Sequence, residues 1–300
     1  MDNAVSLFLT MNVIMKEGYF RQRRSNQKKI SRLKFSYVDI EDLVRDERDI
    51  VDTLKAQTDM NIVTSPDNEK YSHDLFYLAP LYHTKFSRLA RLIVLDIDLG
   101  LLTSVQDLHR QFSQFASGTE CIGLAVDLSP HYWHKLETFR RENPDTELGL
   151  PGDKQGLNTG VALYDLSCLR GSELFANFTT PSQVNTEYRI PSYRVSRDVQ
   201  ISRVVEKFKF PLTLGDQDWL TLLSFEAPSL FHVLPCQYNL QSSVQYLASY
   251  THHGLQELQQ AFPRYHYCVL PHQASIVHLN GCGPKVEHCL KGMYPDKYGE

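Results

Sequence analysis

The residues best suited to chemistry are two aspartates that follow a short apolar run. Asp96 and Asp98 are separated by one residue and come directly after Leu92–Leu95. Such a run is typical of a buried strand, and ligands of α/β proteins bind at the carboxyl ends of strands. Carboxylate oxygens at that position suit Mg²⁺ or Mn²⁺, and the cation would neutralise a diphosphate. The pair indicates a metal and phosphate site; its alternative is two acids that begin a surface turn.

Two kinds of enzyme use an apolar strand that ends in two such aspartates. In nucleotide-sugar transfer both carboxylates serve the metal and its diphosphate. In phosphatases of the haloacid-dehalogenase type the first aspartate is a nucleophile and the second an acid or base. The phosphatase motif continues with Gly and Thr, whereas Leu99 and Gly100 follow here. The phosphatase interpretation is therefore the weaker of the two.

A second group of polar residues precedes an apolar run late in the chain. Asp216, Gln217 and Asp218 follow Gly215 and lead into Trp219. Acids in the first turn of a helix complement its dipole, which is the structural interpretation. In the functional interpretation, these carboxylate and amide groups hydrogen-bond sugar hydroxyls.

In two further segments, polar residues lie at one end of an apolar run. His278 ends the run Ile276–His278 and could bind a metal through a neutral imidazole nitrogen, although a structural hydrogen bond is the commoner role. Asn158 and Gly160 precede another apolar run. Gly160 permits close approach of a ligand, and Asn158 can hydrogen-bond one; an ordinary turn into a strand is the alternative.

The elements that must position these residues alternate between strands and helices, which favours an α/β fold with a mostly parallel sheet. The strands expected are Leu33–Val38, Leu92–Leu95, Cys121–Val126, Thr159–Leu163, Phe231–Leu234 and Ser275–Leu279. The helices expected are Asp39–Ala56, Pro80–Leu89, one capped by Ser104, Val199–Phe208 and Trp219–Phe225.

Composition excludes several classes of protein. Of the 300 residues, 42% are apolar and 22% charged, as in a globular chain. A net charge of −4 excludes a strong chain-wide attraction to nucleic acid. No apolar run reaches 18 residues, and Ala4–Met15 lacks the basic flank of a signal peptide. The segment Lys16–Lys34 carries eight basic residues against one acid and is a solvated face or a phosphate-binding patch.

Taken together, these segments resemble glycosyltransferase family 8, and within it the xyloside xylosyltransferase branch. The resemblance extends from about residue 33 to 290 and rests on Tyr71–Leu78, Ile93–Leu99, Gly156–Leu163, Leu214–Asp218, Leu230–Leu234 with Cys236, Tyr238 and Asn239, and His278–Asn280. It implies the GT-A fold for residues 33–300, a mixed, mostly parallel sheet flanked by helices. Residues 1–32 are then an atypical basic segment. The first GT-A strand is either missing or replaced by Val5–Ile14.

The resemblance also implies a role for each candidate residue. Asp96, Asp98 and His278 would bind Mn²⁺, or Mg²⁺, with both aspartates also serving the donor ribose and diphosphate. Asn158 and Gly160 would line the donor-sugar pocket, and Asp216 would bind the sugar hydroxyls. Gln217 would lie close to the anomeric carbon, and Asn280 would contact the diphosphate or the acceptor. Leu279 stands where the family pattern leads us to expect Gly, which adds bulk beside the metal.

The implied reaction moves xylose from UDP-xylose onto a xylosyl-glucose O-glycan of an EGF-like repeat, with retention of configuration. The alternatives are another UDP-sugar donor, or an inactive remnant that binds sugar or EGF repeats. The implied compartment is the lumen of the endoplasmic reticulum or Golgi, with membrane attachment only through an anchor upstream of this sequence. For this setting we favour the pairs Cys236–Cys268 and Cys282–Cys289 and expect Cys121 and Cys168 to be free and buried.

Overall fold

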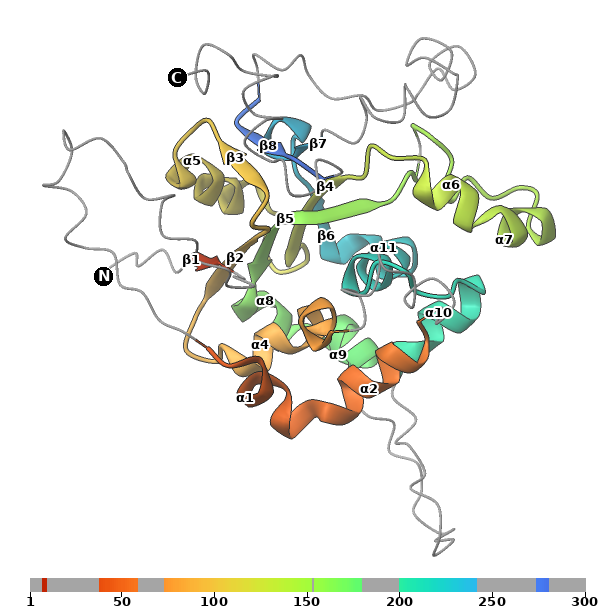
Figure 1. The fold of residues 1–300 in the computed structure, drawn as a ribbon, viewed down its shortest axis with the longest axis horizontal. Coiled ribbons are helices and arrows are strands. Elements are labelled where there is room, and N and C mark those ends of the chain that lie inside the picture. The colour runs from red at the N-terminus through yellow and green to blue at the C-terminus, as the bar shows by residue number, and fades with distance from the viewer. Residues whose placement is uncertain are drawn as a thin grey trace, which may run out of the picture.

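A five-stranded sheet forms the centre of the protein in a computed structural model that describes residues 7–9, 38–58, 73–152, 154–179, 200–241 and 274–280 (Figure 1). Its strand order is β1-β2-β5-β4-β6. The strands are β1 (Leu7–Leu9), β2 (Arg91–Leu95), β4 (Ile122–Val126), β5 (Leu157–Asp165) and β6 (Phe231–Val233). β1 pairs with β2 and β4 with β6 in parallel, whereas β5 is antiparallel to both β2 and β4. The sheet is therefore mixed: β1, β2, β4 and β6 run in one direction and β5 runs against them. This confirms the mixed, mostly parallel sheet that the sequence led us to expect.

A smaller, three-stranded sheet lies beyond the carboxyl end of β2. Its order is β3-β8-β7, formed by β3 (Leu99–Leu101), β8 (Ile276–His278) and β7 (Leu240–Gln241). β3 runs antiparallel to β8, and β7 runs parallel to it. Only three residues separate β2 from β3, so the two sheets meet at that turn.

Short helices surround the main sheet. In Figure 1 most of them, including α8 and α11, lie below it, and α5 lies above with the small sheet. The α-helices are α1 (Ile40–Val44), α2 (Arg48–Ala56), α4 (Tyr82–Lys85), α5 (Val105–Arg110), α6 (His131–Lys135), α7 (Glu137–Glu142), α8 (Leu166–Gly171), α9 (Glu173–Thr179), α10 (Arg203–Phe208) and α11 (Asp216–Glu226). The 3₁₀ turns are Arg45–Glu47, Asp74–Tyr77, Ala79–Leu81, Gln111–Gln114, Gln200–Ser202, Pro228–Leu230 and Cys236–Tyr238.

The predicted helices are confirmed, with shifted bounds. The helix expected over Asp39–Ala56 is α1 and α2, which a 3₁₀ turn separates. Ser104 caps α5, because its side chain accepts a hydrogen bond from the N–H of Gln106. The helix expected over Pro80–Leu89 is shorter, since it begins as a 3₁₀ turn and ends as α4 at Lys85.

Two hydrophobic cores lie on opposite faces of the main sheet. Side chains alternate along β2, so Leu92 and Val94 join one core while Ile93 and Leu95 join the other. The first core contains residues of α2, α8, α10 and α11, and the second contains Leu108 of α5. Burial on both faces explains the uninterrupted apolar run of β2 that the sequence shows.

The edge of the sheet beside β2 is filled by Leu7–Leu9, which pairs with Ile93–Leu95. This agrees with the alternative in which the segment Val5–Ile14 replaces the first strand. The expected strand Leu33–Val38 and the basic segment Lys16–Lys34 lie outside the described residues, except for Val38. Among the described residues, no helix has the length and apolarity needed to cross a bilayer.

The prediction that Cys121 and Cys168 are free was wrong, because they form a disulfide. Cys121 immediately precedes β4, and its carbonyl accepts a hydrogen bond from the N–H of Asp165 at the end of β5 (2.8 Å). This antiparallel register brings α8, which follows β5, to the start of β4. Cys236 is also disulfide-bonded. The favoured pairings of Cys236, Cys268, Cys282 and Cys289 stay predictions, since the last three residues lie outside the described part.

An ion-pair network that joins α2 to the following 3₁₀ turn should make stability depend on pH. Asp74 accepts hydrogen bonds from Arg48 and Lys55, the latter at 2.7 Å. Burial opposes ionisation of Asp74, but these two cations outweigh it and lower the pKa of the carboxyl. Stability from this network is therefore present above the unfolded-state pKa of about 4 and lost as the pH falls through the folded-state pKa.

We expect Asp74→Asn to lower the free energy of unfolding by about 1–3 kcal/mol at pH 7. The difference from wild type should shrink as the pH is lowered below about 4, where the wild-type carboxyl is protonated as well. Urea unfolding of both proteins between pH 3 and 7 measures it. A difference that stays constant over this range would contradict the assigned ion pairs.

Candidate metal centre

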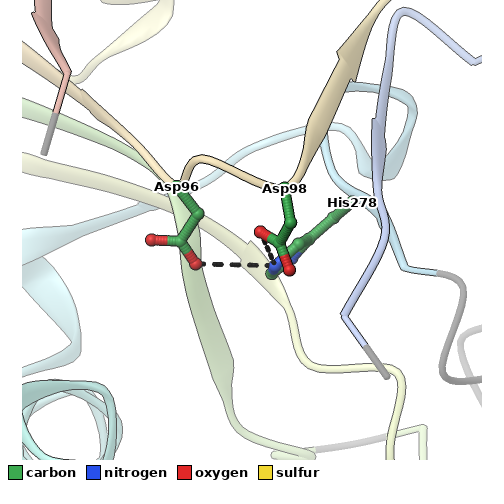
Figure 2. A group of neighbouring side chains, drawn as sticks. All are labelled: Asp96, Asp98 and His278. Atoms are coloured by element: carbon green, nitrogen blue, oxygen red, sulfur yellow. Dashed lines mark ion pairs between the residues drawn. The ribbon is translucent and has the colours of Figure 1, made fainter. Parts of the chain in front are cut away.

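Two aspartates and a histidine converge where the two sheets meet (Figure 2). The Nε2 atom of His278 lies 3.5 Å from Oδ2 of Asp96 and 3.4 Å from Oδ1 of Asp98. Each residue offers one ligand atom, and these atoms lie within 4.8 Å of one another. The structure thus brings His278 to two aspartates that lie 180 or more positions earlier in the sequence.

Strand register explains this convergence. The N–H of Asp96 donates to the carbonyl of Gly160 (2.9 Å), which continues the β2–β5 ladder by one residue. On the other side of the turn, Leu99 pairs with His278, and the N–H of Leu279 donates to the carbonyl of Asp98 (2.9 Å). Main-chain hydrogen bonds therefore hold Asp96 beside β5, which carries Gly160, and Asp98 beside the end of β8, which carries His278.

The charge and burial of the three residues fit a divalent cation. The side chains of Asp96 and Asp98 are 49% and 31% exposed, whereas that of His278 is 4% exposed, so the site opens on the carboxylate side. Burial disfavours the imidazolium of His278, but both carboxylates outweigh it and raise its pKa to about 9. Two carboxylates and one imidazole form a donor set that suits Mn²⁺ or Mg²⁺.

Gly160 provides the space that His278 occupies. A Cβ atom at position 160 would lie 2.2 Å from Cε1 and 2.4 Å from Nδ1 of the imidazole. The ring therefore lies directly against the main chain of β5. The sequence suggested that Gly160 allows close approach of a ligand, and the group that approaches it in the structure is the imidazole itself.

Two buried amides lie on the other side of the ring from the carboxylates. The Oδ1 atoms of Asn158 and Asn239 are each 3.1 Å from Nδ1 of His278. Asn158 is 4% exposed and Asn239 is fully buried. The sequence placed Asn158 in a donor-sugar pocket and gave Asn239 no role, although Asn239 is among the residues that carry the family resemblance.

Gln217 is held at both ends of its side-chain amide. Its Oε1 accepts hydrogen bonds from the N–H (3.2 Å) and the hydroxyl (3.3 Å) of Thr159. Its Nε2 donates to Oδ2 of Asp127 (3.2 Å) and to the hydroxyl of Tyr132 (3.4 Å). Asp127 and Tyr132 are both buried, and the sequence analysis did not single them out.

The acids on either side of Gln217 have opposite electrostatic environments. Burial, together with the charges of Asp96 and Asp218, raises the pKa of Asp216 to about 8, although its Oδ2 accepts from the N–H of Ala79. Asp216 is partly buried, whereas Asp218 is fully buried. His131 and the N–H groups of residues 213 and 214 outweigh the burial of Asp218 and lower its pKa. At neutral pH Asp216 is thus mainly protonated and Asp218 ionised.

A glycine turn sets where this triplet begins. Gly215 has φ of 63°, a conformation that side-chain-bearing residues rarely adopt, and a Cβ there would lie 2.3 Å from the carbonyl oxygen of Phe76. The helix that the sequence predicted from Trp219 therefore starts earlier, and Asp216–Asp218 form its first turn. This position is compatible with both interpretations of Asp216–Asp218, as acids that complement a helix dipole and as groups that bind sugar hydroxyls.

The remaining predicted residues lie at the same turn. Asn280 is half-buried and follows Leu279, whose side chain is fully buried. Asp216–Asp218 lie outside the candidate metal centre, but the pKa of Asp216 responds to the charge of Asp96.

Comparison with known proteins finds similarity to xyloside xylosyltransferases of mouse and human. Over 197 residues the chain is 33% identical to mouse xyloside xylosyltransferase 1, a match that covers 65% of this chain and 45% of the relative. The human xyloside xylosyltransferase 1 is 34% identical over 174 residues, covering 57% of this chain and 40% of the relative. The chain thus matches less than half the length of these relatives. It matches no protein-family model.

A solved structure agrees in fold. The crystal structure of mouse xyloside xylosyltransferase 1 in its apo form superposes with a TM-score of 0.56 and 29% identity, covering 78% of this chain and 74% of that one. Most of this chain therefore shares the fold of that solved structure.

Proposed function

Because this chain is a homologue of xyloside xylosyltransferase 1 and has the GT-A glycosyltransferase fold, we propose that it transfers xylose from UDP-xylose to a sugar acceptor. The observation that supports this most directly is the cluster of Asp96, Asp98 and His278 beside the end of β2. The acceptor we propose is the xylosyl-glucose O-glycan of an EGF-like repeat, in keeping with the relatives' action on a xyloside.

In this proposal Asp96, Asp98 and His278 hold Mn²⁺ or Mg²⁺. The bound cation would neutralise the charge that develops on the departing diphosphate. The carboxylates are the more exposed members of the cluster, so a nucleotide would approach from their side. Asn280 follows β8 at the same turn, where we propose that it contacts the diphosphate or the acceptor.

Asp216 and Gln217 are proposed to face the donor sugar, with Asn158 and Gly160 forming the nearby wall. A protonated Asp216 can donate a hydrogen bond to a sugar hydroxyl and also accept one. Gln217 is fixed by Thr159 and Asp127, so its amide needs no reorganisation when the donor binds.

We propose that the transfer retains the anomeric configuration by attack of the acceptor hydroxyl on the same face that UDP leaves. Gln217, the residue assigned to the anomeric carbon, is an amide and a poor nucleophile. Its oxygen already accepts two hydrogen bonds, which weakens it further. A trapped glycosyl–enzyme adduct would contradict this route.

The proposed place of action is the lumen of the secretory pathway. The disulfide between Cys121 and Cys168 and the bonded state of Cys236 support an oxidising compartment.

The decisive test is metal-dependent turnover of UDP-xylose. We expect the wild-type protein to hydrolyse UDP-xylose slowly, and to transfer xylose to a xylosyl-glucose acceptor, with Mn²⁺ but not with chelator. Asp98→Ala should lower both rates by about 100-fold or more. Asp145→Ala, which removes an exposed carboxylate from a loop, is the matched control and should behave as wild type.

Transfer of another sugar in preference to xylose would replace the proposed donor. An absence of any transfer, together with no Mn²⁺-dependent UDP binding by calorimetry, would overturn the proposed function.

A further inference from the structure

A buried chain of hydrogen bonds begins at a main-chain group and ends at the metal-ligand candidate His278. The N–H of Gly160 donates to Oδ1 of Asn158 (3.0 Å). Because a main-chain N–H can only donate, this contact fixes which end of the Asn158 amide is oxygen. The Nδ2 group of Asn158 is then left for Asp127, whose carboxylate it hydrogen-bonds.

The next link fixes the orientation of Asn239. Its Nδ2 donates to the same oxygen of Asn158 (2.9 Å). The opposite end of this amide, Oδ1, therefore faces Nδ1 of His278 at 3.1 Å. Two acceptor oxygens, one from each asparagine, now meet the same ring nitrogen.

Two acceptors on Nδ1 require that this nitrogen carry the proton. A histidine that binds a cation through Nε2 must keep its remaining proton on Nδ1, and a hydrogen bond from that N–H fixes the ring orientation. Nε2 is the nitrogen that faces Asp96 and Asp98. The amide pair thus has the polarity that a metal-binding imidazole needs.

We propose that Asn239, supported by Asn158, is a positioning residue that holds His278 in the Nδ1–H form with Nε2 directed at the cation. The inference depends on the metal site of the proposed function and adds a residue to it that does not touch the metal. Full burial of Asn239 excludes a role in contacting a dissolved substrate.

Three variants separate this role from simple loss of a buried amide. Asn239→Leu keeps the approximate volume and removes the acceptor, whereas Asn239→Asp keeps an acceptor oxygen for Nδ1. Gln241→Leu is the matched control. Gln241 lies two residues further along, is 2% exposed, and bonds the N–H of Leu128 and the carbonyl of Val126.

Mn²⁺ binding, measured by electron paramagnetic resonance with UDP present and without donor sugar or acceptor, reports the outcome. We expect Asn239→Leu to weaken Mn²⁺ binding by about 10–100-fold, as changes to partners of metal-binding histidines do. Asn239→Asp keeps the acceptor for Nδ1 but loses the donor to Asn158, so it should bind Mn²⁺ more tightly than Asn239→Leu. Gln241→Leu should lower the metal-free melting temperature but leave the Mn²⁺ affinity unchanged.

The result would overturn the inference if Asn239→Leu bound Mn²⁺ as wild type does, or if Asn239→Asp were weakened as much as Asn239→Leu. A wild-type protein that binds no Mn²⁺ would overturn the inference and the proposed metal site together. If instead Mn²⁺ binding followed the expected order while no xylose was transferred, the inference would stand and the proposed function would fall.

Discussion

Replacing Gly160 by alanine is expected to eliminate divalent-cation binding while leaving the fold intact. The new Cβ would lie 2.2–2.9 Å from three atoms of the His278 ring, too close for any real contact. The ring cannot shift slightly, because it is 4% exposed and hydrogen-bonded to two buried asparagines. We expect the imidazole to leave its place, which removes one of the three proposed ligands. Changes to the hydrogen-bond partners of metal-binding residues lower metal affinity by up to about 100-fold. Loss of the imidazole itself should lower the Mn²⁺ affinity by more than that.

Gly171→Ala is the matched control, since a Cβ there meets no atom within 4 Å. It should bind Mn²⁺ as wild type does in the same titration. A double-mutant cycle gives the sharper result: if Gly160→Ala acts through His278, it should have no further effect in a His278→Ala background. An intact Mn²⁺ affinity combined with loss of UDP-sugar binding would instead favour the role that the sequence suggested, a glycine that admits the donor sugar.

Much of this centre could be predicted from residue types. Asp96 and Asp98 follow an apolar strand and His278 ends another, so a pattern of buried strands with polar ends identified all three members of this cluster. Asn239 and Asp127 could not be found in the same way. Their contribution depends on hydrogen bonds to side chains 39 to 90 residues away, and such contacts leave no local pattern.

The fold shows the same limit. The apolar runs identified the strands of the sheet because burial on both faces demands them. Periodicity does not report strand direction, so the sequence could not identify β5 as the antiparallel strand of the mixed sheet. The error over Cys121 and Cys168 has the same origin, since only the antiparallel pairing of β4 with β5 brings α8 to the start of β4.

The largest effect on stability is expected from Asp218→Ala. The carboxylate is fully buried and accepts hydrogen bonds from the N–H of Thr213 (2.6 Å), the N–H of Leu214 (2.7 Å) and the hydroxyl of Tyr132 (3.0 Å). Alanine would leave these donors buried without partners, each at a cost of about 1–3 kcal/mol before relaxation. We expect the free energy of unfolding to fall by about 3–5 kcal/mol in urea titrations.

Asp218→Asn tests which feature of the carboxylate matters. The amide keeps one oxygen for the two main-chain N–H groups, and its Nδ2 can donate to the Tyr132 hydroxyl, which then acts as an acceptor. The expected loss is therefore smaller, about 1–3 kcal/mol. Asp145→Ala, on the surface, should stay within about 0.5 kcal/mol of wild type. Equal losses for Asp218→Ala and Asp218→Asn would show that negative charge, rather than hydrogen-bond acceptance, secures the start of α11. Because the Tyr132 hydroxyl also accepts from Gln217, Asp218→Asn should disturb the proposed catalytic amide even where the protein stays folded.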